Sequence, residues 1–120
     1  MNGFVDNAGR ALIEIELRAT RDAPPLSTTV WIDTGFTGDL VLPQAVIDDL
    51  ALSLTGTVGA VLADGSELVM RTYRCFVQWF DELRRLEVVA NQGEHPLLGV
   101  GLLLDHELRI DYRANEITLV

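Results

Sequence analysis

Apolar and polar side chains alternate along several short segments of the chain, each bounded by glycine, proline or charged residues. In residues 11–18, Ile13, Ile15 and Leu17 alternate with charged residues, which is the period of a strand buried on one face. Further strands are predicted at 28–32, 41–42, 58–62, 68–72, 86–90, 108–112 and 117–119, with an interior strand at 75–80 that is apolar on both faces.

Helical spacing occurs at two places. Val46, Ile47 and Leu50 recur at it after Pro43, which suits the first position of a helix. The run 102–104 predicts another helical turn or two. Short strands joined by turns, with little helix, indicate an all-β class and a mostly antiparallel barrel or sandwich. With 120 residues, 48% of them hydrophobic, we expect one domain spanning 1–120.

Charge and cysteine content exclude several functions. The chain has 18 acidic and 9 basic residues, a net charge of −9, and every basic residue is arginine. The absence of lysine excludes a Walker P-loop and a Schiff-base lysine, and the acidic balance argues against a nucleic-acid partner. Cys75 is the only cysteine, so no intrachain disulfide and no cysteine-based zinc site can form.

The chain start and the longest apolar run bear on localisation. The first residues lack the basic and apolar regions of a secretory leader. The longest nearly unbroken apolar run, 97–104, is far shorter than a membrane-spanning helix. We therefore expect a cytoplasmic protein with no membrane partner.

One segment has the composition of a chemical site. Asp33 ends an apolar strand and is followed at once by Thr34 and Gly35. A buried carboxylate needs hydrogen-bond donors, and the N–H groups of a turn supply them. Taken alone, an Asp-Thr-Gly triplet is most often a turn that caps its own loop.

Two later segments change this interpretation. A hairpin is predicted about thirty residues on, with the polar tip Ala63-Asp64-Gly65-Ser66, and Leu97-Leu98-Gly99 follows near the end of the chain. With Ile32-Asp33-Thr34-Gly35 as the catalytic loop, the sequence resembles the retropepsin-like aspartic proteases, most closely their small microbial single-domain branch with a D-T-G-F motif. The resemblance spans nearly the whole chain in the right order.

The resemblance implies the closed β-barrel of the acid proteases, with one or two short helices. It assigns catalysis to Asp33, Thr34 and Gly35, and substrate binding by a flap to Ala63, Asp64, Gly65 and Ser66. It also places Leu98 and Gly99 in the strand beside the catalytic loop. Because the chain has one Asp-Thr-Gly, the mechanism requires a homodimer with Asp33 of each subunit at the twofold axis.

The implied reaction is hydrolysis of a peptide or an unfolded protein by water, with no cofactor and no metal. The two carboxylates share one proton, one activating the water and the other protonating the scissile carbonyl. Thr34 would hydrogen-bond across the axis, and Gly35 would direct its N–H at the carboxylates. Activity should be bell-shaped against pH and favour acid conditions.

Two departures from the family pattern concern Phe36 and the flap tip. Better-known retropepsins have a small residue after the motif's glycine, where this chain has Phe36, which could support the loop from below or narrow the cleft. Asp64 adds an acid to the flap tip that could disfavour acidic peptides. Neither departure removes a catalytic group.

Other hypotheses remain open. A module of the same fold could bind extended peptides with weak or no catalysis, or Asp33 could be a turn residue of a monomeric structural domain. A phosphate loop of the actin type needs two large lobes, which 120 residues cannot build.

Isolated polar and aromatic residues are expected to be structural. Glu94-His95 and Asp105-His106-Glu107 match no tight metal motif and are predicted as solvated turns. Asp111 lacks a following glycine and is expected to be a structural or surface acid. The remaining candidates are expected in the core or at a dimer contact: Cys75, Trp79 and Phe80.

Overall fold

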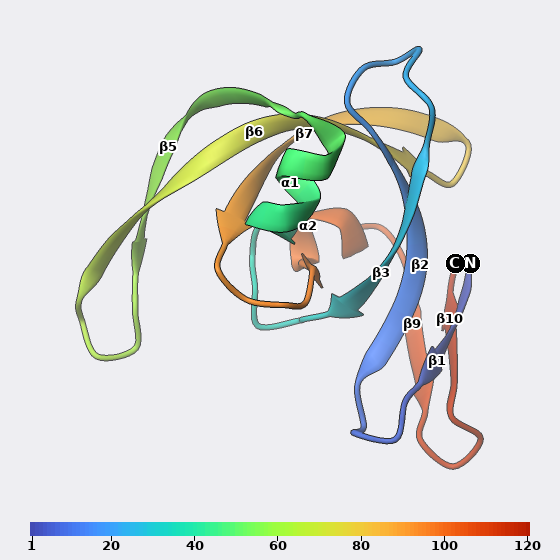
Figure 1. Ribbon diagram of the computed structural model, residues 1–120. Helices are drawn as coiled ribbons and strands as arrows, with labels where there is room; N and C mark the ends of the chain where they lie inside the picture. The colour runs from blue at the N-terminus through green and yellow to red at the C-terminus, as the bar shows by residue number, and fades with distance from the viewer.

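Ten strands and two short helices make up the chain, and the computed structural model describes residues 1–120 (Figure 1). The strands are β1 (Asn2–Val5), β2 (Ala11–Arg18), β3 (Leu26–Ile32), β4 (Leu40–Pro43), β5 (Ser53–Val61), β6 (Glu67–Trp79), β7 (Glu82–Asn91), β8 (Leu97–Leu98), β9 (Leu108–Asp111) and β10 (Glu116–Leu119). The helices are α1 (Gln44–Leu50) and α2 (Val100–Leu103). Neither helix is long and apolar enough to cross a membrane.

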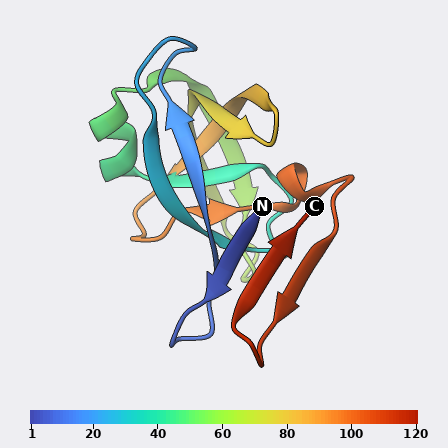
Figure 2. The ribbon, with the colours of Figure 1, turned by 90° about the vertical axis from the view of Figure 1, so that its right-hand side faces the viewer.

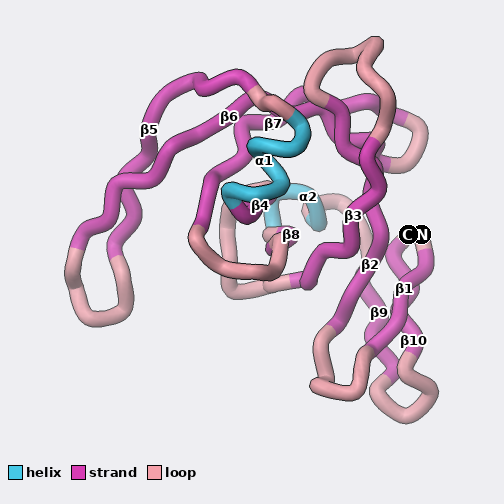
Figure 3. Tube along the Cα trace, in the orientation of Figure 1, coloured by secondary structure: helices cyan, strands magenta, loops and turns pink.

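Six strands close into a barrel. They are hydrogen-bonded in the order β6-β7-β4-β8-β3-β2, and β2 returns to β6 where Leu17 faces Val77. The β3–β8 and β4–β7 pairs are parallel, and the remaining pairs are antiparallel. Figure 3 distinguishes these strands from the two helices, of which α1 contacts β4 and β7. The predicted all-β class and mostly antiparallel barrel are confirmed.

The core follows the alternation read from the sequence. In β2, Ile13, Ile15 and Leu17 are buried, while Glu14 and Glu16 are exposed. Twenty-two buried residues form one hydrophobic cluster inside the barrel. Leu40, Leu98 and Leu102, which flank the loop after β3, belong to it and are at most 1% exposed. The loop after β3 is therefore anchored on the best-packed part of the molecule.

Among the predicted boundaries that differ in the structure, two have a clear physical reason. Pro43 is the last residue of β4 and the N-cap of α1, not its first helical residue, because its ψ of 146° is extended while it pairs with Asn91. The segments predicted separately at 68–72 and 75–80 belong to one strand, β6, of 13 residues. No glycine or proline interrupts β6, so the ladder continues from the hairpin into the barrel wall.

The chain ends lie side by side at one edge of the sheet (Figure 2). The Leu119 N–H donates to the Met1 carbonyl at 2.8 Å, and the Met1 amino group donates to the Leu119 carbonyl at 2.7 Å. β10 pairs with β1 on one side and β9 on the other. Both edges of β10 are thus occupied within the chain, and β9 forms the free edge of this part of the sheet.

Candidate active site

The carboxylate of Asp33 is held at the point where β3 ends. The Asp33 N–H donates to the Leu98 carbonyl at 2.8 Å, and the Gly35 N–H donates to Asp33 Oδ1 at 2.9 Å. Asp33 is half-buried, and its Oδ2 has no hydrogen-bond partner within the chain. One carboxylate oxygen is therefore fixed by the turn, as expected for a buried acid, while the other is available to a ligand.

The segment 98–101 braces the loop that carries Asp33. β8 lies between β3, to which it is parallel, and β4, to which it is antiparallel. Three further backbone hydrogen bonds link residues 99–101 to the loop after β3. They run from Gly99 N–H to Asp39 O at 2.9 Å, from Val100 N–H to Phe36 O at 2.8 Å and from Gly101 N–H to Gly38 O at 2.9 Å. Leu98 and Gly99 thus lie beside the loop, where the sequence placed them.

The ring of Phe36 packs under the loop. A Cβ added to Gly38 would lie 2.5 Å from Phe36 Cζ, and one added to Gly99 would lie 2.5 Å from Phe36 Cδ2. Phe36 also lines the hollow in front of the loop. The ring therefore lies between positions 38 and 99 and also forms part of the wall of this hollow.

A hollow of about 530 Å³ separates the loop from the hairpin arm formed by β5 and the first part of β6. Residues 35–40 line one side, and residues 58–61 and Met70 line the other. The arm therefore covers the loop with apolar side chains, chiefly Val58, Ala60 and Met70. The sequence predicted the arm's alternation but not which face turns toward residues 35–40, since that depends on the bend of the hairpin.

The hairpin tip lies beyond the lining of this hollow. Ala63, Asp64, Gly65 and Ser66 are all exposed, and none of them borders it. The Ser66 hydroxyl donates to Asp64 Oδ1 at 2.5 Å, and the Ser66 backbone N–H donates to the same oxygen at 2.9 Å. Both bonds lower the pKa of the Asp64 carboxyl, the hydroxyl more than the N–H. Gly65 has a φ of 84°, as this turn requires.

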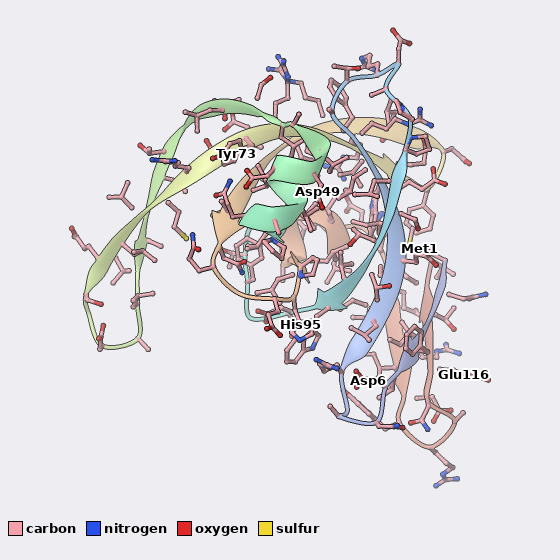
Figure 4. All side chains as sticks on the ribbon, viewed as in Figure 1. Met1, Asp6, Asp49, Tyr73, His95 and Glu116 are labelled. Carbon is pink, nitrogen blue, oxygen red and sulfur yellow. The ribbon has the colours of Figure 1, made fainter.

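A smaller hollow, of about 290 Å³, lies beside Asp33 itself and is lined by Trp31, Ile32 and Leu97. The Arg10 guanidinium carbon is 5.8 Å from the centre of the Trp31 ring. Arg10 Nη1 lies 2.7 Å from His95 Nε2, and its Nε donates to Asp6 Oδ2 at 2.7 Å. Figure 4 labels Asp6 and His95, the two partners of Arg10, on the lower side of the molecule. His95 is therefore part of a structural cluster.

Thr34 is exposed and its hydroxyl has no hydrogen-bond partner within the chain. In Figure 1 the loop after β3, the hairpin tip and the β1–β2 and β9–β10 turns all lie along the lower side of the molecule. Within this group, Asp33 is the carboxylate that directly follows β3.

The remaining candidates take structural positions. Asp111 is exposed, and its Oδ1 accepts the N–H groups of Arg113 and Ala114 in a turn. Cys75 is fully buried in the core, and desolvation raises the pKa of its thiol to about 11.

Three of these candidates, Trp79, Phe80 and His106, pack on one another. Trp79 is 3% exposed, and its Nε1–H donates to His106 Nε2 at 3.3 Å. Phe80 is half-buried and stacks on the His106 ring at 4.6 Å. No three histidine, cysteine, aspartate or glutamate side chains are grouped so as to hold a metal ion.

We compared the sequence and the fold of this chain with those of known proteins. No protein-family model and no curated protein matches the sequence. Among solved structures, a retropepsin-like aspartic protease from Rickettsia conorii is similar, with a TM-score of 0.68 and 20% identity over 99% of this chain and 88% of that chain. The EIAV protease in complex with the inhibitor HBY-793 has a TM-score of 0.57 and 17% identity over 83% of this chain and 90% of that chain. The chain therefore has the fold of the retropepsin-like aspartic proteases, as the sequence predicted.

Proposed function

We propose that this protein is an aspartic endopeptidase that acts as a homodimer. The observation that carries the proposal is the position of Asp33, at the end of β3 on a hydrogen-bonded loop. The hollow beside it is lined by Asp33 itself, and the hollow under the arm is lined by the neighbouring Gly35. The retropepsin-like fold supports the same function.

A second copy is needed because peptide hydrolysis of this type uses one carboxylate as base and another as acid. The chain contains one Asp-Thr-Gly sequence. In a twofold dimer, each subunit contributes Asp33 through the same surface. Two carboxylates about 3 Å apart share one proton, which gives the pair both roles. The exposed hydroxyl of Thr34 is free to hydrogen-bond across this axis.

The chain's own groups then perform the reaction. The ionised carboxylate removes a proton from water, and the water oxygen bonds to the scissile carbonyl carbon. The protonated carboxylate donates its proton to the carbonyl oxygen, which gives a tetrahedral gem-diol. The carboxylate that took the water's proton then passes it to the amine nitrogen as the C–N bond breaks, and a gem-diol hydroxyl returns its proton to the other carboxylate. The Gly35 N–H fixes Asp33 Oδ1, so the carboxylate enters the reaction already oriented. The apolar arm excludes water around the bound peptide.

The test is cleavage of an unfolded protein across a range of pH by the wild type and by Asp33→Asn. Asp49→Asn, an exposed acid on α1, is the matched control. We expect cleavage by the wild type and the control, none by Asp33→Asn, and a dimer for all three by sedimentation velocity. Equal cleavage by Asp33→Asn, or activity of a strictly monomeric protein, would overturn the proposal. Substrate binding without cleavage by any variant would favour the peptide-binding module instead.

A further inference from the structure

A second hollow, also of about 530 Å³, lies where β6 separates from β7. β6 pairs with β7 only from Thr72 onward, and residues 67–71 pair with β5 alone. Beyond Val89, β7 pairs instead with β4. The two strands diverge in Figure 1, and the hollow occupies the fork between residues 68–71 and residues 90–92. We name this hollow the β6 groove.

Residues 67–71 leave one edge of β6 without a neighbouring strand. The backbone N–H and C=O groups along such an edge are free to pair with another chain. Five extended residues span about 16 Å, which is enough for a short peptide to add a strand. The geometry therefore favours an extended polypeptide over a compact ligand.

The lining of the β6 groove selects the charge of that polypeptide. Val69 and Leu68 present apolar surface, at 71% and 46% exposure. Arg71 is the one charged residue of the lining, is exposed, and forms no ion pair. The other polar members are the amides Gln44, Asn91 and Gln92. A groove with one cation and no carboxylate stands out in a chain of net charge −9.

Nearby acids do not neutralise Arg71. Asp48 accepts a hydrogen bond from Gln44 Nε2 at 3.0 Å, and it is not part of the lining. Glu67 begins β6 and also lies outside the lining. A carboxylate brought by a partner would therefore meet a free guanidinium beside apolar surface, where an Arg–carboxylate contact is favourable.

We propose that the β6 groove binds an extended acidic polypeptide segment, at a site separate from the cleft beside Asp33. The segment adds a strand to residues 67–71, with its carboxylates on the face of Arg71 and its apolar side chains on the opposite face, beside Leu68. This inference goes beyond the proposed peptidase function and does not rest on it. Because Met70 borders both the β6 groove and the hollow under the hairpin arm, a protein bound here is held close to that hollow, which raises its local concentration there.

The test measures fluorescence anisotropy of a fluorescein-labelled octapeptide of alternating valine and glutamate. The titrated protein is Asp33→Asn, which keeps the fold and avoids cleavage of the probe. We expect saturable binding, and about threefold or more weaker binding of the peptide with glutamine in place of glutamate. Methylation of alternate backbone nitrogens should abolish binding, because it removes the donors that pair with β6.

Arg71→Gln should remove the preference for glutamate over glutamine. Arg74→Gln, a half-buried arginine on the same strand outside the lining, is the control and should keep it. Equal affinity for the two peptides would overturn the proposal. If Arg71→Gln still bound the glutamate peptide more tightly than the glutamine peptide, the proposal would also be overturned, because the peptide would then bind away from Arg71. An oligomeric state changed by Arg71→Gln in the absence of peptide would show that the groove holds a second copy instead. Because Asp33→Asn is used throughout, these results are independent of whether the wild type cleaves peptides.

Discussion

The ring of Phe36 fills the space that a side chain at position 99 would need. A Cβ at Gly99 would lie 2.5 Å from Phe36 Cδ2 and 2.2 Å from the Gly38 carbonyl oxygen. Real Cβ atoms do not approach other atoms this closely, so the two glycines and the phenyl ring form one packing unit. The chain therefore accommodates a large residue after Gly35 by lacking side chains at 38 and 99.

The first prediction concerns this packing unit. Gly38→Ala should lower the free energy of unfolding by about 1–3 kcal/mol, because the three atoms nearest to the added methyl group all belong to the Phe36 ring, at 2.5–3.3 Å. In a Phe36→Ala background the same substitution should cost much less, a coupling that urea unfolding of the four proteins would measure.

Gly99→Ala provides the matched control for that cycle. Its Cβ meets the Gly38 carbonyl oxygen as well as the ring, so Phe36→Ala should not restore stability. If Gly38→Ala and Phe36→Ala were additive, the ring would not occupy the position described here.

The sequence predicted the residues of the loop better than the residues of the cleft. Asp33, Gly35 and Gly99 take positions set by local turn chemistry and by a short strand, and these leave a signature in sequence. Val58 and Met70 line the cleft only because the hairpin arm bends over the loop. Alternation shows that the two share a face, but the curvature of the arm, which turns that face toward residues 35–40, has no local signature.

The second prediction tests whether the active unit contains Asp33 from two chains. Wild type and Asp33→Asn are mixed in equal amounts, unfolded together and then refolded, so that subunits assort at random. If both carboxylates are needed, only the dimers with two wild-type subunits are active, which are about one quarter of all dimers. The mixture should then have about one quarter of the activity of an equal total amount of protein that is all wild type. Independent monomers would give about one half, and that result would contradict the shared pair.

The third prediction follows from the burial of Cys75. Desolvation raises the pKa of this thiol to about 11, against 9.0 for an ordinary cysteine. Iodoacetamide should therefore leave the folded protein unmodified at pH 8.5 and alkylate it rapidly in urea, as mass spectrometry would show. Rapid alkylation of the folded protein would mean that β6 opens frequently in this region.

The same thiol affects stability in alkaline solution. The unfolded state loses the proton from about pH 9, whereas the folded state keeps it until about pH 11. The stabilising contribution is therefore fully present below pH 9 and is lost as pH rises through this window. Cys75→Ala should lack this part of the decline, and a difference between the two proteins that is constant from pH 8 to 11 would contradict the assignment.

The strands that the sequence missed are those formed by distant pairing. β1 has four residues, one of them Gly3, and no apolar alternation, yet it lies between β2 and β10. A Cβ at Gly3 would lie 2.2 Å from the Leu12 carbonyl oxygen, so close strand approach explains this glycine. Barrel closure likewise depends on contacts between β2 and β6, about 60 residues apart, which no local pattern reveals.

The last prediction concerns Asp6, which joins the β1–β2 turn to the cluster around Trp31. The backbone N–H of Arg10 donates to Asp6 Oδ1 at 2.9 Å, and this bond, with the Arg10 side chain and the Ala8 N–H, lowers the pKa of Asp6 from its usual 3.8. The unfolded state therefore takes up this proton first as pH falls. The stabilisation is present above pH 3.8 and is lost as pH falls through the folded-state pKa.

Asp6→Asn should lower Tm at pH 7 and have progressively less effect below pH 4, measured by circular dichroism. Asp49→Asn, whose side chain makes no hydrogen bond, should leave Tm unchanged at pH 7. An effect of Asp6→Asn that is equally large at pH 7 and pH 2 would show that shape, rather than charge, holds the turn against Arg10.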